Sequence, residues 1–192
     1  MHGADHNGAG LPGSSTFARG SSAAGNVLGW EIRQAHFAQR DGVNERILSD
    51  LQNGVTGIIL KGAPTELESL SSVLDGVYLD LAPVHLAPGS SLAQIHVLIA
   101  LCDRGCKDLS LLRNNLGLDP VGLLARTGRS VFELQAEVAQ CVDAVTQISK
   151  SHPNIRSIAL DGSTWADAGA SDAQELGAVL STGVMWLRAL TA

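Results

Sequence analysis

The chain has 192 residues, enough for one domain with a buried core, and 45% of them are apolar, which excludes a disordered protein. Its net charge is −6 and its Lys and Arg residues are scattered singly, so nothing favours binding to nucleic acid or an anionic membrane. Cys102, Cys106 and Cys141 lack the C-x-x-C spacing of zinc sites and are odd in number, so we expect reduced thiols. We therefore predict a cytoplasmic protein without a bound metal.

The first 26 residues are rich in Gly, Ser and Ala and predict a flexible tail. Gly8, Gly10 and Gly13 spell G-x-G-x-x-G, but no predicted strand precedes them and no predicted helix follows. A dinucleotide site needs both elements, so this motif predicts none. We place the folded domain at residues 27–192.

Strands and helices alternate from residue 27 onward. Residues 29–34 predict an extended segment, 43–52 a helix with one apolar stripe, and 55–60 a buried strand. A helix that ends at residues 75–76 and a strand over 77–81 repeat the pattern. This order is typical of βα units.

The second half of the chain continues the alternation. Ser91 is placed to cap a helix that Gly105 ends, and Ser171 with Gln174 predicts a capping box for another helix, which Gly183 ends. We expect further strands over residues 109–113, 157–160 and 184–190, and a long helix over 131–148.

About five βα units predict a parallel sheet joined by right-handed crossovers. Periodicity alone does not separate an open doubly wound sheet from part of an eight-stranded barrel. A complete barrel takes roughly 250 residues, more than this chain offers. Because no helix is predicted after the last strand, we expect either a completing partner or a fragment.

Five segments resemble the methylmalonyl-CoA mutases, which depend on adenosylcobalamin. G-W-E-I-R-Q (29–34) resembles the W-x-I-R-Q segment that opens the family's barrel, and N-E-R-I-L-S-D-L-Q-N-G-V-T-G-I-I-L (44–60) resembles its first helix and strand. The stretches G-V-Y-L-D-L-A-P (76–83), N-L-G-L-D-P-V-G-L-L-A-R-T-G (115–128) and D-A-G-A-S-D-A-Q-E-L-G (167–177) follow in the family's order.

The resemblance implies a partial (β/α)8 TIM-type barrel in the α/β class. It also implies a role in the interconversion of methylmalonyl-CoA and succinyl-CoA, a radical rearrangement for which adenosylcobalamin supplies the radical. In heterodimeric members one chain is catalytic and the other is an inactive relative. The blocks at 119–128 and 168–177 are similar to those of the small, inactive subunit.

The resemblance further implies that this chain has no catalytic residues. The catalytic family's tyrosine after I-R-Q is Ala35 here, its tyrosine and histidine are Ser163 and Thr164, and one of its glutamines aligns with Asn114. None of the six histidines stands in the D-x-H-x-x-G motif that holds cobalamin. We therefore expect a truncated small subunit that binds no cofactor, with a catalytic large subunit as its partner and the adenosylcobalamin on that partner.

The alternative is a free-standing domain that binds acyl-CoA or another small molecule without catalysis. Its candidate contact residues are His85, Asn114, Ser163 and Thr164. Asp80 and Asp161 also follow predicted strands, where barrel enzymes keep their chemistry, but we expect them to cap turns. We predict that His96, within an apolar helix, is a packed histidine.

Overall fold

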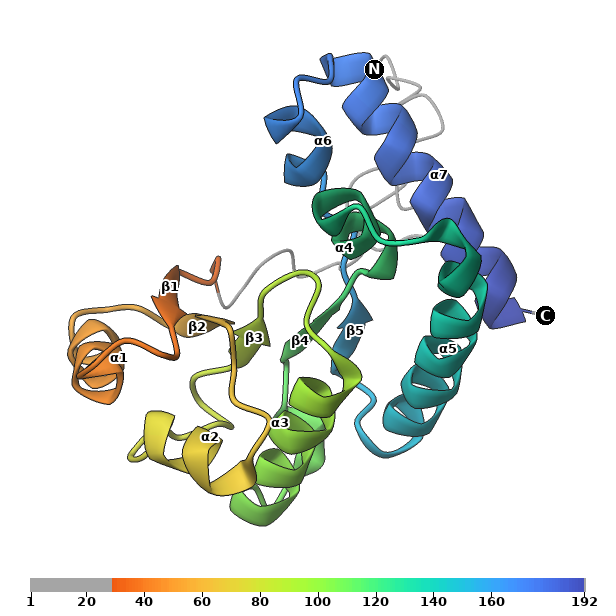
Figure 1. Cartoon of the computed structure of the whole chain (residues 1–192). Coiled ribbons are helices and arrows are strands. Elements are labelled where there is room, and N and C mark those ends of the chain that lie inside the picture. The colour runs from red at the N-terminus through yellow and green to blue at the C-terminus, as the bar shows by residue number, and fades with distance from the viewer. Residues whose placement is uncertain (1–28, 192) are drawn as a thin grey trace, which may run out of the picture. The chain divides into compact units, whose positions relative to one another are not determined.

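Five short parallel strands alternate with helices along the described part of the chain (Figure 1). The computed structural model describes residues 29–191, so the predicted tail over residues 1–26 lies outside the described part. Residues from Arg33 onward form one unit, which is described here by itself. The strands are β1 (Arg33–Phe37), β2 (Gly57–Lys61), β3 (Val84–Leu86), β4 (Asn115–Leu118) and β5 (Arg156–Ile158).

Helices fill most of the segments between and after the strands. They are α1 (Val43–Gln52), α2 (Leu67–Val73), α3 (Leu92–Gly105), α4 (Pro120–Thr127), α5 (Leu134–Ser151), α6 (Ser163–Asp167) and α7 (Asp172–Thr191), with 3-10 turns at η1 (Leu109–Leu111) and η2 (Val131–Glu133). Within the described residues, no helix is both long and apolar enough to cross a bilayer.

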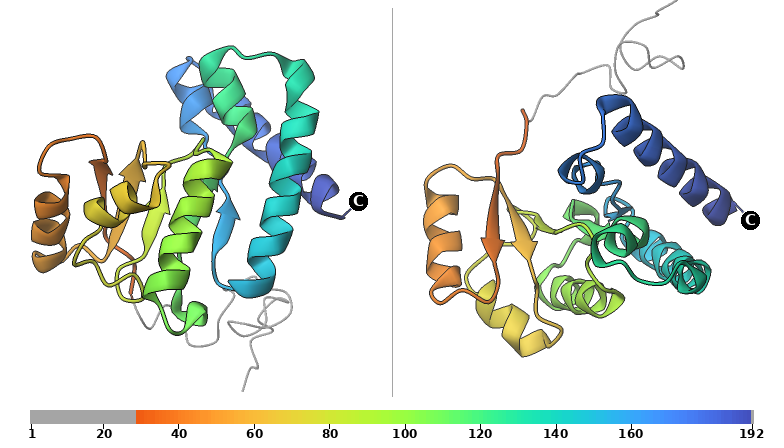
Figure 2. Two further views of the ribbon diagram at one scale, coloured as in Figure 1. Left: turned by 60° about the horizontal axis from the view of Figure 1, so that its bottom comes forward. Right: turned by 45° about the horizontal axis from the view of Figure 1, so that its top comes forward.

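The strands form two small sheets, ordered β1-β2-β3 and β4-β5. The register places Ala35 opposite Ile59 and Ile59 opposite His85, so these three residues form one row across the first sheet. Figure 2 shows α2 and α3 lying along β2 and β3. The predicted α/β class with parallel strands is thus confirmed.

The core lies between these strands and helices. In β2, Ile58 and Leu60 are fully buried while Ile59 is only partly so. Their buried side chains join a cluster with Ile47 of α1 and Leu70 of α2. Because successive strand residues point to opposite faces, α1 and α2 cover the face that Ile58 and Leu60 share.

The predicted strand over 77–81 is wrong. This segment turns instead, with the N–H groups of Leu81 and Ala82 both donating to the Tyr78 carbonyl. Tyr78 and Leu81 are 73% and 75% exposed. The strand begins only after Pro83, whose carbonyl accepts from the N–H of Ile58, and it is too short and too polar to show an apolar run.

The predicted strand over 109–113 is also wrong, since residues 109–111 form η1. The side chain of Asp108 accepts from the N–H of Ser110 and so favours the turn. The true strand, β4, contains Gly117 at φ +68°, where an added Cβ would lie 2.4 Å from the Ala87 carbonyl oxygen. A glycine inside a strand made the segment resemble a loop.

The predicted strand over 184–190 is helix, because α7 continues to Thr191. Gly183 does not end this helix but allows close packing, since a Cβ there would lie 3.3 Å from Leu160 Cδ1. Trp186 points inward and is only 3% exposed. The expectation of a last strand without a covering helix therefore fails.

Candidate functional site

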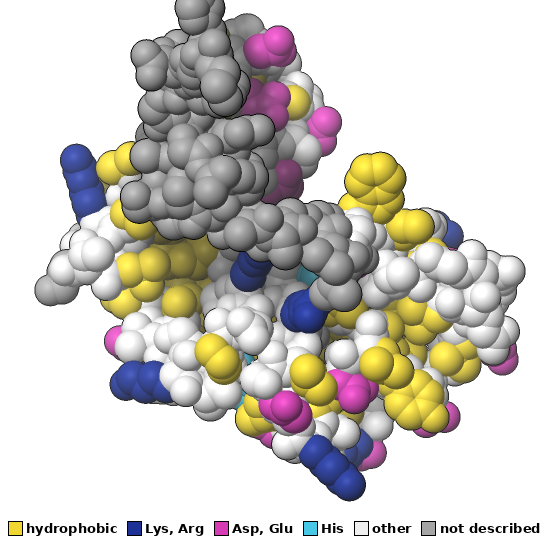
Figure 3. Space-filling view, turned by 180° about the vertical axis from the view of Figure 1, so that it is seen from behind, with side chains coloured by type: hydrophobic (Ala, Val, Ile, Leu, Met, Phe, Trp, Pro, Cys, Tyr) yellow, Lys and Arg dark blue, Asp and Glu magenta, His cyan; other side chains and the backbone are white. Residues whose placement is uncertain are grey.

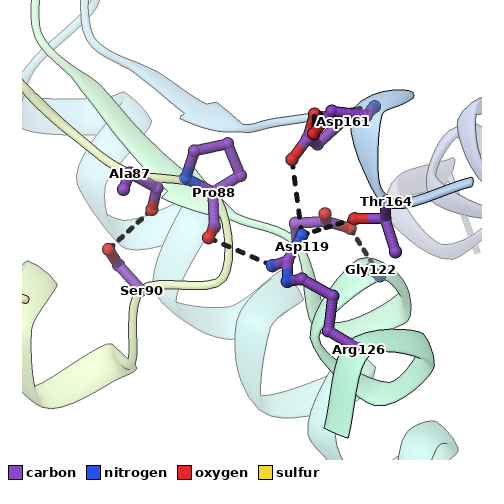
Figure 4. Close-up of polar contacts among 9 residues, drawn as sticks. Ala87, Pro88, Ser90, Asp119, Gly122, Arg126, Asp161 and Thr164 are labelled. Carbon is purple, nitrogen blue, oxygen red and sulfur yellow. Dashed lines mark hydrogen bonds and ion pairs between the residues drawn. The ribbon is translucent and has the colours of Figure 1, made fainter. Parts of the chain in front are cut away.

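One guanidinium joins three segments at the carboxyl ends of β3, β4 and β5 (Figure 4). Arg126 on α4 donates from Nη1 to Asp161 Oδ2 at 3.3 Å and to Thr164 Oγ1 at 2.5 Å. From Nη2 it donates to the Pro88 carbonyl at 3.1 Å. We call Arg126, Asp161, Thr164 and the neighbouring Asp119 the Arg126 cluster.

Local sequence chemistry places Arg126. Asp119 follows β4, and its Oδ1 accepts from the Gly122 N–H at 2.9 Å, which caps the start of α4. Pro120 occupies the first turn, where its missing N–H costs nothing. Gly89 leaves room for the guanidinium, because an added Cβ would lie 2.5 Å from Arg126 Nη2.

Asp161 holds the other side of the cluster. Its Oδ1 accepts from both the backbone N–H and the hydroxyl of Ser163, at 3.1 and 2.7 Å, while Oδ2 faces Arg126. Asp161 therefore does stabilise the turn into α6, as expected. Ser163 is exposed, whereas Thr164 is buried with its hydroxyl against Arg126.

Burial dominates the electrostatics of Asp119. Desolvation raises the pKa of Asp119, and Asp161 raises it further, while the Gly122 hydrogen bond and Arg126 lower it. Asp119 Oδ2 is buried and has no hydrogen-bond partner. The cluster carries two carboxyl groups and one guanidinium, so its charge disfavours a phosphorylated ligand such as CoA.

His85 and Asn114 lie at the seam between the two sheets. The Asn115 N–H donates to His85 Nδ1 at 3.0 Å, and Asn114 Nδ2 donates to the Val84 carbonyl at 2.9 Å. Both side chains are buried, and the described strands β3 and β4 share no backbone ladder. Hydrogen bonds of these two side chains therefore join β3 to β4, as backbone hydrogen bonds join neighbouring strands elsewhere in a sheet.

The remaining candidates are spread over the unit. Ala35 lies in the middle of β1 and is exposed, at the far end of the strand order from Ser163 and Thr164. Asp80 lies in the turn before β3, not at the carboxyl end of a strand, and is exposed. The prediction that His96 is packed is wrong, since it points outward from α3.

Sequence reasoning missed Arg126 and Asp119. A signal for Asp119 existed, since Asp-Pro followed two residues later by Gly is a helix-start pattern. Arg126 offered none, because its partners lie 35 to 38 residues away along the chain.

The cysteine thiols are not built for chemistry. All three are free, and burial raises the pKa of Cys102 to about 12 and that of Cys141 to about 11. Such thiols stay protonated and are poor nucleophiles. Across residues 29–191, no group of three or more His, Cys, Asp or Glu residues is arranged to hold a metal.

Comparison with known proteins identifies the chain's relatives. The family described as methylmalonyl-CoA mutase matches residues 61–192. The methylmalonyl-CoA mutase small subunit of Streptomyces virginiae is 41% identical over 95% of this chain, and that of Propionibacterium freudenreichii subsp. shermanii is 30% identical over 94%. The chain spans only 30% and 28% of the length of these relatives. It belongs to the methylmalonyl-CoA mutase family.

Proposed function

We propose that this chain is a non-catalytic part of a mutase small subunit. Its role is to support a catalytic large subunit that interconverts methylmalonyl-CoA and succinyl-CoA. The observation that carries the proposal is the environment of Thr164, the residue at the position where the resemblance implies a histidine. Thr164 is buried and its hydroxyl accepts from Arg126, so it offers no imidazole to a thioester carbonyl.

Ala35 supports the same proposal from the other end of the strand order. The resemblance implies a tyrosine at this position, and the structure places a methyl group there, on an exposed part of β1. A methyl group neither donates nor accepts a hydrogen bond. Neither position therefore supplies the polar group that catalysis in this family would use.

A partial barrel is the architecture we propose for the assembled protein. The parallel orders β1-β2-β3 and β4-β5, with a helix after each strand, suit the first five units of a (β/α)8 barrel. Further units would come from the part of the subunit that the chain does not span. We infer a cytoplasmic location, which free, protonated thiols favour.

Adenosylcobalamin belongs, in this proposal, to the catalytic partner. Its cobalt would need a histidine that is oriented by a neighbouring aspartate and open to the ligand. Among the histidines within residues 29–191, the one that is exposed, His96, lies on the outer side of α3. Three buried histidines of this part of the chain already contact other residues. His36 Nε2 lies 3.3 Å from Asp50 Oδ2, the Asn115 N–H donates to His85 Nδ1, and His152 Nε2 lies 2.9 Å from Asp103 Oδ1.

The alternative, acyl-CoA binding without catalysis, rests on the position of the Arg126 cluster at the carboxyl ends of strands. Its charge argues against this ligand, because CoA carries phosphates and Arg126 already faces Asp161. Calorimetric titration of the chain with CoA distinguishes the two. We expect no heat of binding, and saturable binding that Arg126→Ala abolishes would favour the alternative.

Measuring turnover directly tests the proposal that this chain is not catalytic. The chain alone, supplied with adenosylcobalamin and methylmalonyl-CoA, should form no succinyl-CoA above a protein-free control. The same chain added to a catalytic mutase chain should leave turnover number per catalytic chain intact or raised. Succinyl-CoA formed by the chain alone would end the proposal.

A further inference from the structure

Three polar side chains join the end of α3 to the end of α5. Ser151 is the last residue of α5, His152 follows it, and Asp103 lies in the last turn of α3. The Oγ of Ser151 lies 2.8 Å from His152 Nδ1, and His152 Nε2 lies 2.9 Å from Asp103 Oδ1. Both helices run in the same direction and end on the same side of the unit (Figure 2). We call these three residues the Ser151 cluster.

The partners of the imidazole fix the positions of the protons in this cluster. A carboxylate can only accept, so the neutral ring of His152 donates from Nε2 to Asp103. Its Nδ1 then carries a lone pair, which accepts from the hydroxyl of Ser151. The same hydroxyl lies 3.4 Å from the Ile148 carbonyl, a longer and weaker contact. The single proton of the hydroxyl therefore points to the imidazole.

The backbone and the surroundings of His152 hold its ring in place. Its N–H donates to the Ile148 carbonyl at 2.8 Å, and its carbonyl accepts from the Ile155 N–H at 3.2 Å. Its side chain is buried, and on the face that Figure 3 shows histidine reaches the surface only in small areas. Ser151, in contrast, is exposed. The cluster thus presents an accessible hydroxyl next to a base with a fixed orientation.

This geometry matches the arrangement that activates a serine for nucleophilic attack. Such a hydroxyl lies about 2.6–3.2 Å from a base that a third group orients, and the geometry identifies it whatever the order of the residues in the chain. Ser149 provides a contrast on the same helix, because its hydroxyl donates to the Thr146 carbonyl at 3.1 Å. The Ser151 cluster precedes β5 whereas Asp161 follows it, so this cluster is separate from the Arg126 cluster.

We propose that Ser151 is an acylation site that reacts with activated esters and thioesters. The hydroxyl oxygen attacks the acyl carbon and forms an ester bond, while the bond from that carbon to the leaving oxygen or sulfur breaks. The hydroxyl proton passes to Nδ1 of His152 and from there to the leaving group or to water. Asp103 is a positioning residue, since it acts through the imidazole. This inference is independent of the proposed function, because it uses neither the strand-end residues nor a catalytic partner.

The experiment treats the full chain with p-nitrophenyl acetate and locates the acetyl groups by tandem mass spectrometry. We expect Ser151 to be acetylated at least about tenfold faster than Ser149, which is equally exposed but contacts a carbonyl instead of an imidazole. Hydroxylamine should remove the acetyl group from Ser151, because it cleaves an ester but not an amide on the neighbouring Lys150. Ser151→Ala should abolish the fast release of p-nitrophenolate, and Ser149→Ala, the matched control, should leave it unchanged.

Asp103 variants separate positioning from a merely structural role. The Asp103 side chain is 50% exposed, so we expect Asp103→Asn to fold, with an unchanged circular dichroism spectrum. This variant should slow acetylation of Ser151 about tenfold and leave that of Ser149 unchanged, and Asp103→Glu should recover part of the rate. Equal acetylation rates at the two serines would overturn the inference. So would a fast release of p-nitrophenolate that survives Ser151→Ala, or an Asp103→Asn variant that slows both serines alike.

Discussion

The backbone N–H of Asn115 donates to Nδ1 of His85 across the gap between β3 and β4, at 3.0 Å. An Nδ1 that accepts a hydrogen bond carries no proton, so the neutral ring of His85 has its proton on Nε2. This contact holds β4 beside β3 where the backbone ladder is interrupted. His85, a candidate ligand contact in the sequence analysis, therefore stabilises the fold in the structure.

Replacing His85 should cost stability. His85→Ala removes a buried side chain and leaves the Asn115 N–H without its acceptor in a partly buried site, and we expect a loss of about 2–4 kcal/mol in the free energy of unfolding. His96→Ala, on the exposed side of α3, should change it by less than about 0.5 kcal/mol. Urea unfolding measures both, and equal effects would contradict the structural role.

The Arg126 cluster should contribute stability through its hydrogen bonds. Arg126→Ala removes three donors to Asp161, Thr164 and Pro88, and because the side chain is 33% exposed we expect a loss of only about 1–2 kcal/mol. Arg126→Lys should recover little, since an ammonium does not reproduce the planar fork. Arg188→Ala serves as the control. If thermal unfolding showed equal losses for Arg188→Ala and Arg126→Ala, the hydrogen bonds of the Arg126 cluster would not contribute to stability.

The contribution of Asp119 to the stability of the fold should decrease as the pH rises. Its pKa is raised above the ordinary 3.8 mainly by burial, so folding favours the protonated form. That contribution is present below pH 3.8 and is lost as the pH rises through the higher pKa of the folded state. Asp119→Asn keeps an oxygen for the Gly122 N–H and cannot ionise. The stability of this variant relative to the parent should therefore increase with pH across this window.

Urea unfolding at several pH values between 3.5 and 7 provides this comparison. Asp108→Asn is an informative control, because hydrogen bonds from Ser110 lower the pKa of Asp108. Its relative stability should change with pH in the opposite direction, falling as the parent gains from an ionised Asp108. If the two variants showed the same sign, the assignment of burial as the cause at Asp119 would be wrong.

Two glycines should respond oppositely to alanine. At Gly117, φ is +68° and an added Cβ meets the Ala87 carbonyl oxygen, so Gly117→Ala should cost about 2 kcal/mol or more. Gly177 lies within α7 with no atom within 4 Å of an added Cβ, so Gly177→Ala should gain about 0.5–1 kcal/mol. Thermal unfolding of both variants tests the close approach of Gly117 to the Ala87 carbonyl, and a tolerated Gly117→Ala would contradict it.

Sequence periodicity predicted elements well where one face is apolar and the other polar. The helix over Val43–Gln52 and the helix that Ser91 caps are confirmed, because each buries one stripe and ends at a recognisable turn. For α7 the pattern predicted the first part of the helix, up to Gly183, but failed over residues 184–190, where two apolar faces together resemble a buried strand. It also failed for β3, where a three-residue strand containing His85 carries no periodic signal.

The Arg126 cluster was beyond reach of sequence patterns for a different reason. Its contacts join residues that only the fold brings together, such as Arg126 and Thr164. Spacing along the chain reports which residues share one helix or strand, and says nothing of which loops meet at the ends of neighbouring strands. Only the two members with a local partner had a pattern to find them, Asp119 with Gly122 and Asp161 with Ser163.

The measurement that tests the central claim most directly is the mass of the species formed with a catalytic mutase chain. Co-expressed and purified through a tag on the catalytic chain, the two proteins should elute together, and light scattering should give the mass of one copy of each. The Thr164→Ala variant should bind equally well, because no catalytic group is lost. A chain that never joins the catalytic chain, and elutes alone at the mass of a monomer, would contradict a supporting role.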